Sequence, residues 1–390
     1  MRRASNTALA VVAIALWTAP GAGAQGNLST LGFGYPPGQL SARAQATGGA
    51  IGEMDPISPL NPAALINWGG PAVYFQIEPE FRRVDAAGVS DRTTTARYPL
   101  TGGALSLGSR WMVGIAASTF LDRSWATTSR TTHQVGTETV PATTTFRSEG
   151  AINDVRLALA WAARPWLRVG LGAHALTGQN RVGVIDQFDD TATYDPLVQD
   201  TTISYRGTAL SGGVEVRAGG MASVAASMRV GGRVRAVSGD ATIGKATVPT
   251  RFGVTVAYLG ITNSAIALRT AYDKWSSLES LGRPGLRAVD AWDTSLGADI
   301  AGPRVAGNRA LMLRAGVRWR TLPFAVGVPS PGDGVNAHRV SERSLSAGVG
   351  TSLARGRASV DLGLIRATRD AGLSVDERAW ILTIGMQVRP

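Results

Sequence analysis

Residues 41–65 read Ser41-Ala-Arg-Ala-Gln-Ala-Thr-Gly-Gly-Ala-Ile-Gly-Glu-Met-Asp-Pro-Ile-Ser-Pro-Leu-Asn-Pro-Ala-Ala-Leu65. The stretch contains the glycine pair Gly48 and Gly49 and then Asn61-Pro62-Ala63, and its apolar residues follow no regular period. It lies between an apolar N-terminus and a long series of alternating segments. Glycine and proline without periodicity are typical of irregular structure. We therefore expect residues 25–68 to form a unit separate from the strands that follow.

Residues 1–24 predict an export signal. Arg2 and Arg3 supply the positive start, Ala8 to Trp17 is an apolar run, and Ala22-Gly23-Ala24 is a small-residue cleavage site. The run is too short for a membrane-spanning helix. We expect cleavage after Ala24, and an uncleaved anchor is the alternative. Because the chain has no cysteine, a lipoprotein anchor, disulfides and thiolate metal sites are excluded.

The chain is basic, with 39 Lys and Arg against 28 Asp and Glu and a formal net charge of +11. Its basic residues are not clustered with aromatics in the pattern of nucleic-acid binders, so we expect no nucleic-acid partner. A solvated surface and a polar interior account for the charge. Attraction to anionic lipid headgroups is compatible with it.

After Trp68 the apolar residues fall at every second position, which predicts strands. The last segment shows this best, since Trp380, Leu382, Ile384, Met386 and Val388 share one face and Ile381 is the exception on the other. About fourteen such segments can be counted. They lie near 71–83, 96–108, 110–122, 149–162, 166–180, 202–217, 221–236, 247–260, 262–275, 288–301, 307–320, 341–354, 357–369 and 377–389.

The connections favour a membrane barrel over a soluble sandwich. Short links alternate with long, polar ones near 122–148, 181–201, 276–287 and 322–340, as in outer-membrane barrels. Several segments are also longer than the usual strand of a soluble protein. We predict an all-β fold, a transmembrane antiparallel β-barrel with its apolar face toward lipid and its polar face lining the lumen. Tryptophans near segment ends are expected in the interfacial girdles, namely Trp111, Trp125, Trp166, Trp275, Trp292, Trp319 and Trp380.

Four stretches, in this order along the chain, carry a resemblance to a known family. They are the N-terminal stretch ending in Asn61-Pro62-Ala63-Ala64-Leu65, Val248-Pro249-Thr250-Arg251-Phe252-Gly253-Val254, Ala271-Tyr272-Asp273-Lys274-Trp275-Ser276-Ser277-Leu278, and Leu313-Arg314-Ala315-Gly316-Val317-Arg318-Trp319 followed by Pro323-Phe324. Together they resemble the FadL-type outer-membrane transporters of hydrophobic compounds. Two features depart from that family: the chain ends in Val388-Arg389-Pro390 without a terminal aromatic, and Glu53 and Asp55 are the only acids before Asn61.

The resemblance implies an outer-membrane barrel of fourteen strands, residues 69–390, with residues 25–68 inside it as a hatch, or plug. It implies uptake of long-chain fatty acids or hydrocarbons by binding in the barrel, hatch movement and lateral release into lipid. Gly48, Gly49, Asn61, Pro62 and Ala63 would then form the hatch motif. Apolar residues of the hatch, Leu28, Leu31, Phe33, Tyr35 and Leu40, are candidate ligand contacts, and packing of the hatch against the wall explains them equally well. The implied partners are a hydrophobic small molecule and outer-membrane lipid.

Two alternatives remain open from the sequence. A related branch of barrels docks partner proteins of secretion machinery, which would bind here at the external loops. The other alternative is a barrel enzyme acting on lipid. The three histidines, His133, His174 and His338, have no metal-ligand spacing, and the chain lacks a G-x-S-x-G elbow. We therefore expect no enzyme activity, no cofactor and no metal. The sequence gives no oligomeric state.

Overall fold

The computed structural model describes residues 34–86, 89–281, 287–305, 309–329, 335–353, 356–370 and 375–390. The predicted export signal lies outside these residues. Their strands are β1 (Ala72–Ala86), β2 (Val89–Arg97), β3 (Leu100–Leu107), β4 (Trp111–Asp122), β5 (Trp125–Val135), β6 (Glu138–Arg164), β7 (Leu167–Phe188), β8 (Leu197–Ala218), β9 (Ala222–Ser238), β10 (Ala241–Thr247), β11 (Arg251–Tyr258), β12 (Ala265–Asp273), β13 (Ala291–Val305), β14 (Arg309–Pro329), β15 (Val335–Leu353), β16 (Ala358–Asp370) and β17 (Val375–Val388).

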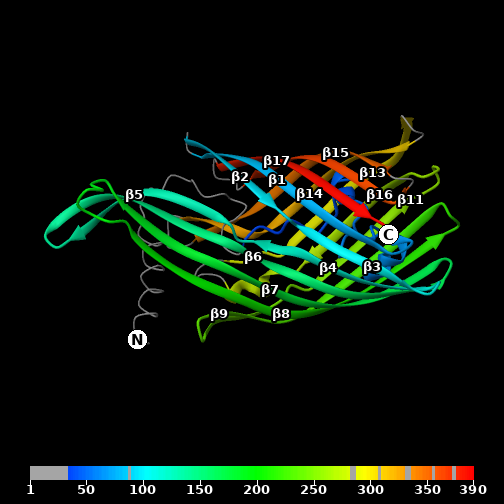
Figure 1. Cartoon of the computed structure of the whole chain (residues 1–390), viewed down its shortest axis with the longest axis horizontal. Helices are drawn as coiled ribbons and strands as arrows, with labels where there is room; N and C mark the ends of the chain where they lie inside the picture. Colours follow the sequence, from blue (N-terminus) through cyan, green and yellow to red (C-terminus); the bar gives the residue numbers. More distant parts are fainter. Residues whose placement is uncertain are drawn as a thin grey trace.

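All strand pairs are antiparallel, and β17 pairs with β1, so the sheet closes on itself (Figure 1). Three pairs of strands are each one interrupted strand, because both members pair with the same neighbour. These are β2 and β3 on β1, β4 and β5 on β6, and β10 and β11 on β9. Counted in this way, the described residues form a barrel of fourteen strands, which confirms the predicted number and order.

The interruptions have local causes. Pro99 separates β2 from β3 and Pro249 separates β10 from β11, and proline has no N–H to donate to a ladder. Between β4 and β5 the N-terminal segment pairs with the wall instead. The Tyr35 N–H donates to the Asp122 carbonyl at 2.7 Å, and the Asp122 N–H donates to the Tyr35 carbonyl at 2.8 Å.

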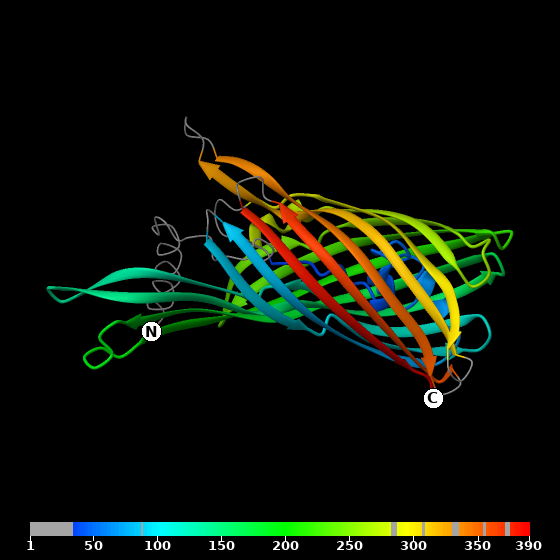
Figure 2. The ribbon, with the colours of Figure 1, turned by 90° about the horizontal axis from the view of Figure 1, so that it is seen from above.

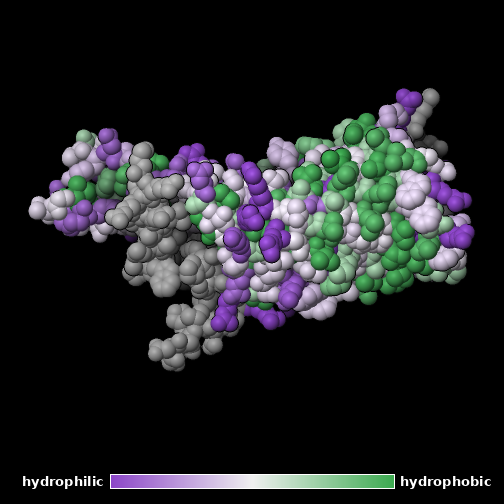
Figure 3. All heavy atoms as spheres, turned by 90° about the horizontal axis from the view of Figure 1, so that it is seen from below, coloured by the Kyte–Doolittle hydropathy of each residue, from purple (hydrophilic) through white to green (hydrophobic). Residues whose placement is uncertain are grey.

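The outer face of the barrel is apolar over a broad belt (Figure 3). On β17, Trp380 and Met386 are 45% and 47% exposed, whereas Thr383 is fully buried, which confirms the predicted facing of this strand. Ile381, the exception to the alternation, faces inward and packs in a buried cluster with Ile365. Because the belt consists of outward side chains from most strands, the molecule has its apolar surface outside.

The inner face packs against the N-terminal segment, residues 34–70, which lies inside the barrel (Figure 2). Helix α2 (Ala42–Ala46) contacts β14–β17, and the 3-10 helix η2 (Pro62–Trp68) contacts β4, β6, β7 and β8. A Cβ built on Gly385 of β17 would lie 2.8 Å from the Cβ of Ala42. The inward face of β17 therefore lies against the segment, which fills the space inside the barrel at this strand.

Three of the predicted long links contain paired strands instead of being loops throughout. Residues 322–340 contain the end of β14 and the start of β15, which pair with each other. Residues 125–148 form a hairpin of β5 and the start of β6, and residues 181–201 contain the ends of β7 and β8. In residues 125–148, threonines stand on both faces of the strands, so the apolar residues do not alternate. The sequence therefore shows no strand signal there, although threonine favours strands. The hydroxyls of Thr131 and Thr144, for example, meet across the hairpin at 2.6 Å.

Trp275 is not part of a girdle. It begins the 3-10 helix η3 (Trp275–Leu281), is buried and stacks on Phe120 with ring centroids 5.2 Å apart. Trp111, Trp166, Trp292, Trp319 and Trp380 point outward as expected. Among the described residues, no helix is long and apolar enough to cross a membrane.

Replacing Leu171 on the outer face of β7 by Arg should destabilise the barrel in lipid vesicles by about 2–4 kcal/mol, because a cation would face hydrocarbon. The matched control is Gln179→Arg, on the same strand and face but nearer the hairpins, for which a cost of about 0–1 kcal/mol is expected. Urea unfolding in vesicles measures both. Equal losses would contradict the assigned belt.

Candidate functional site

Tyr35 anchors the start of the N-terminal segment. Four guanidinium groups lie 4.5–5.6 Å from the centre of its ring, those of Arg82, Arg97, Arg320 and Arg369. The Tyr35 hydroxyl donates to Glu342 at 3.1 Å and accepts from Arg369 at 2.8 Å and from Arg320. Burial raises the pKa of Tyr35, although Arg320 and Arg369 oppose the shift, so the hydroxyl keeps the proton that it donates. The ring therefore connects strands on both sides of the β1–β17 pair, where the barrel closes.

The arginines around Tyr35 are matched by buried acids. Arg369 is fully buried and pairs with Glu80 at 3.0 Å, with Glu342 at 2.6 Å and with Glu377. Arg97 pairs with Asp122 at 2.5 Å and with Glu80. A buried charge is tolerated only when it is paired and hydrogen-bonded, and here each of these arginines has a carboxylate partner.

Glu53 anchors the middle of the segment. Its carboxylate is completely buried and accepts from Arg251 at 2.9 Å, from Arg269 at 3.3 Å and from Ser227 at 2.5 Å. Burial alone would raise the pKa of Glu53, but Arg251 and Arg269 hold it below its usual value of 4.5. Because this pKa is depressed in the folded state, the group stabilises the fold above its unfolded pKa. That contribution is lost as the pH falls through the folded value.

Asn61, Pro62 and Ala63 form the start of η2 and rest on wall glycines. Asn61 caps the helix, its Oδ1 accepting from the Ala63 N–H at 2.9 Å, and its Nδ2 donates to the Glu53 carbonyl at 2.9 Å. A Cβ on Gly170 of β7 would lie 2.5 Å from the backbone of Pro62, and one on Gly213 of β8 would overlap Asn61. Glycine at these wall positions lets the motif approach the sheet.

The glycine pair allows a similar close approach of the segment to β14. Gly48 has φ +68° and Gly49 has φ +92°, which favour glycine, and a Cβ on Gly48 would lie 2.9 Å from the backbone of Val317. Val317 belongs to the fourth of the quoted stretches, and Arg251 and Gly253 belong to the second. The N-terminal stretch thus contacts the second stretch through Glu53 and Arg251. It contacts the fourth stretch where Gly48 meets Val317. Asp273 of the third stretch lies 3.6 Å from Arg251, so all four meet inside the barrel.

Gln39 connects the segment to a polar network that the sequence does not suggest. Its Nε2 donates to Ser118 at 2.8 Å and to Asp154 at 2.9 Å, and its Oε1 accepts from Arg229 at 3.0 Å. These bonds hold Gln39 at φ 52°, an unfavourable backbone conformation for glutamine.

His174 lies between the same Asp154 and Ser211. Its Nδ1 is 2.9 Å from Asp154 Oδ1, and its Nε2 is 2.8 Å from the Ser211 hydroxyl. This order of side chains is that of a serine hydrolase. All three are buried, however, and Asp154 is also held by Gln39. The arrangement therefore supports the packing of the segment, and neither of the two larger cavities described below is lined by Ser211.

Cavities lie on both sides of the segment. A cavity of about 450 Å³ lies toward the short turns, between Met54, Asp55 and Asn67 of the segment and the ends of β7–β9, β11 and β12. A smaller one of about 50 Å³ lies toward the hairpins, where Gly38 and Gln39 meet Phe120 and Trp275. The segment separates the two spaces.

Beyond the smaller cavity the inner face is apolar. Thirteen buried residues form one cluster there: Phe120, Leu121, Ile152, Leu176, Tyr205, Ala209, Val234, Ala236, Val248, Trp275, Leu278, Ala288 and Ala291. They come from several strands, from η3 and from connecting residues scattered along the chain. No local pattern could have singled them out.

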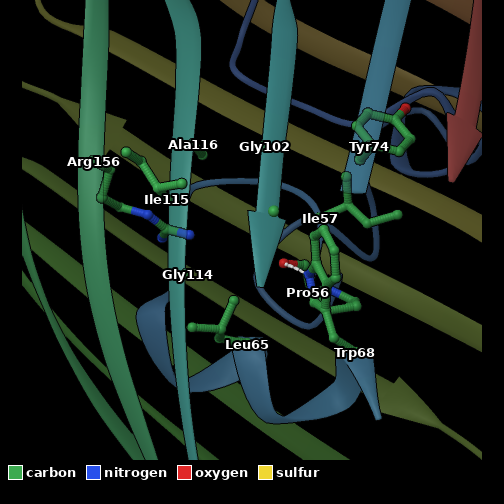
Figure 4. A pocket seen from close by; sticks show the side chains of 11 residues that line it. Pro56, Ile57, Leu65, Trp68, Tyr74, Gly102, Gly114, Ile115, Ala116 and Arg156 are labelled. Atoms are coloured by element: carbon green, nitrogen blue, oxygen red, sulfur yellow. Dashed lines mark hydrogen bonds between the residues drawn. The ribbon is translucent and has the colours of Figure 1, made fainter. Parts of the chain in front are cut away.

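Arg156 of β6 is a buried cation that forms no ion pair among the described residues, although the charges of Asp154 and Glu53 act on it. It lines a small cavity of about 10 Å³ together with Leu65, Trp68, Tyr74 and Ile57 (Figure 4). Its Nε and Nη1 have no hydrogen-bond partner among the described residues. Burying an unpaired polar group is costly, so an anion or a water molecule that accepts hydrogen bonds here would stabilise the guanidinium group.

The predicted ligand contacts have different outcomes. Leu28, Leu31 and Phe33 lie outside the described residues. Tyr35 is held by the four arginines, and Leu40 is buried against Ala44, Ile51 and Leu60 of its own segment. A ligand role for these residues stays a prediction. His133 lies 3.2 Å from Asp186 on the hairpin formed by β5 and β6. Within the described part of the chain, no group of three or more possible ligands is arranged to hold a metal ion.

The fold of this chain is similar to that of several solved structures. The chain is similar to a FadL homologue from Pseudomonas aeruginosa, with a TM-score of 0.61, 10% identity, and coverage of 91% of this chain and 99% of that one. It is also similar to the toluene transporter TodX from Pseudomonas putida (TM-score 0.58, 13% identity, 90% and 98% covered) and to the monoaromatic hydrocarbon channel CymD (0.54, 14%, 90% and 97%).

The chain therefore has the fold of the FadL-type channels over nearly its whole length, as the resemblance implied. Of the structures with this fold, CymD is a monoaromatic hydrocarbon channel, and TodX, like TbuX from Ralstonia pickettii, is a toluene transporter. At the level of sequence, no protein-family model and no curated protein matches.

Replacing Glu53 by Gln should loosen the segment, because Arg251 and Arg269 would lose their shared carboxylate. Breaking a buried charge pair costs about 3–5 kcal/mol. Amide hydrogen exchange of residues 47–58 should accelerate at least tenfold. The exposed Glu149→Gln is the matched control and should leave exchange unchanged. Unchanged exchange in E53Q would contradict the anchoring role.

Proposed function

We propose that the protein is an outer-membrane barrel that takes up hydrophobic small molecules. A ligand binds inside the barrel, residues 25–68 move as a hatch, and the ligand leaves sideways into lipid. One observation carries the proposal: the segment lies between a small cavity at the hairpin end, which adjoins a cluster of buried apolar side chains, and a cavity of about 450 Å³ at the other end. Displacing it would join the two. The apolar belt supports a membrane location, and the channels of similar fold support the class of activity.

The apolar cluster beside the smaller cavity favours an apolar ligand, while charged side chains such as Arg229, Arg251 and Asp273 line that cavity itself. Buried apolar surface stabilises a hydrophobic solute by about 25 cal/mol per Å² and offers nothing to a hydrated ion. Apart from the two backbone bonds between Tyr35 and Asp122, the polar contacts described above that hold the segment involve side chains, and the strand ladders do not depend on them. The hatch could therefore move while the barrel keeps its closure.

Arg156, which forms no ion pair among the described residues, supports an acid over a hydrocarbon as the ligand. It lies among apolar side chains at the border of hatch and wall, where a carboxylate would satisfy its guanidinium and an apolar chain would contact Leu65, Trp68 and Ile57. The cavity there has room for little more than one water, so such a ligand requires the hatch to shift.

Locking the hatch should stop uptake. A Cβ on Gly363 of β16 would lie 3.3 Å from the Cβ of Ala46, close to the 3.5–4.5 Å of a disulfide, and the chain has no other cysteine. In proteoliposomes, oxidised Ala46→Cys/Gly363→Cys should lose at least nine-tenths of fatty-acid uptake and regain it on reduction. Each single variant is a control. Full uptake through the oxidised protein would contradict hatch movement.

Replacing Arg156 by Gln tests the ligand class. Binding of a long-chain fatty acid should weaken about tenfold or more, since hydrogen bonds to charged groups contribute about 1.5–3 kcal/mol. Binding of an alkane of equal length should stay the same or improve. Fluorescence displacement measures both ligands on the purified protein. Parallel losses for acid and alkane would argue against a carboxylate at Arg156.

The alternative is a barrel that docks a partner protein. It is favoured by the paired hairpin of residues 125–148, whose exposed side chains are mostly polar and which extends past most of the other strands (Figure 1). Deleting residues 128–145 should leave fatty-acid binding intact if the protein is a transporter. A protein that binds no hydrophobic ligand but retains a partner through this hairpin would support docking.

A further inference from the structure

We propose that four cations on the outer face of β8, β9 and β10 bind the phosphates of anionic lipid headgroups, in the leaflet nearer the long hairpins. They are Arg206, Arg233, Arg235 and Lys245, and we call them the basic cluster. The inference rests on the proposed function in one respect, the membrane location of the barrel. It adds a specific partner at a surface that uptake of a ligand does not involve.

Strand register brings the basic cluster together. Arg206 of β8 lies opposite Arg235 of β9, and Arg235 lies opposite Lys245 of β10. Facing residues in an antiparallel ladder have Cα atoms about 4.5–5.5 Å apart, so three cations form one row across three strands. Arg233 is two residues from Arg235 on the same face. All four side chains are exposed.

The cations of the cluster have no partner within the part of the chain that the structure describes. None of the four side chains makes an ion pair or a hydrogen bond there. Other outward arginines do have one, since Arg181 binds Asp200 and Arg83 lies 3.0 Å from Asp85. Like charges that face each other across strands destabilise a sheet. A bound anion would remove that repulsion, so the row is suited to hold one.

The depth of the cluster suits a headgroup. On the same face, Leu210 and Val230 lie opposite each other and are 67% and 49% exposed, which places them in the apolar belt. Arg206 lies four residues before Leu210 on β8, nearer the hairpins, which is about 10 Å in height for a tilted strand. Figure 3 shows hydrophilic residues gathered where the hydrophobic belt ends on this face.

Phosphate is the anion that this geometry favours. Several cations on neighbouring strands can share the oxygens of one or two phosphates, whereas a single carboxylate would occupy only one or two of them. Juxtamembrane Lys and Arg gain from anionic headgroups within a Debye length of the surface. The long stems of Arg and Lys can also extend along the belt while their charged ends reach the headgroups.

The test compares two triple variants with the same change of charge. Arg206→Gln/Arg235→Gln/Lys245→Gln removes the row, and Arg110→Gln/Arg164→Gln/Arg357→Gln removes three exposed arginines at the short-turn end. The probe is a diphosphorylated glycolipid added to protein in neutral detergent at 0.15 M salt, with binding read by native mass spectrometry. The same glycolipid without phosphates serves as the second probe.

The row variant should bind the diphosphorylated lipid at least tenfold more weakly than the unchanged protein, and the control variant should bind it as the unchanged protein does. The dephosphorylated lipid should not distinguish the three proteins. Equal binding by the row variant, or an equal loss in the control, would overturn the proposal. Fatty-acid binding is measured on the same samples, and its absence in all three would count against the proposed function and not against the basic cluster.

Discussion

Inside a filled barrel, inward charged side chains are removed from water and need partners within the protein, and much of this molecule's interior follows from that constraint, with Arg156 as an exception. The inner face carries arginines and carboxylates from strands all around the wall, and the N-terminal segment removes them from water. Arg369, fully buried, is satisfied by Glu80, Glu342 and Glu377 from three further strands. Such pairs add little net stability but are costly to break singly, so they fix where the segment lies.

The same chemistry makes the segment a separable part. It is held by charged side chains and by glycine contacts such as those of Gly170 and Gly213, and only Tyr35 joins the wall through backbone pairing. Side-chain bonds can exchange partners without opening the ladder, which gives a hatch a physical basis. The basic cluster on the outer face differs from this interior, because its cations on β8–β10 have no carboxylate partner among the described residues and lie at the expected level of the headgroups.

The sequence predicted the wall better than the interior. The alternation of apolar residues at every second position located fourteen strands in order, because the strands contribute outward apolar side chains to the belt. It could not show that residues 125–148 pair, since their threonines carry no apolar period. Tyr35 was predicted from its apolar ring as a ligand contact, yet its surroundings are arginines from β1, β2, β14 and β16, which no local pattern connects. The sequence indicated Gly48 and Asn61 as parts of a motif. It did not indicate the wall glycines that contact this motif.

The most direct test of the account is the position of the segment with and without ligand. Because the chain has no cysteine, spin labels can be placed at Met54, which lines the cavity of about 450 Å³, and at Gly219 in the turn between β8 and β9. Pulsed electron resonance in lipid should give one narrow distance without ligand and a second distance once a long-chain fatty acid is added. A single unchanged distance, with the fatty acid demonstrably bound, would contradict a moving hatch.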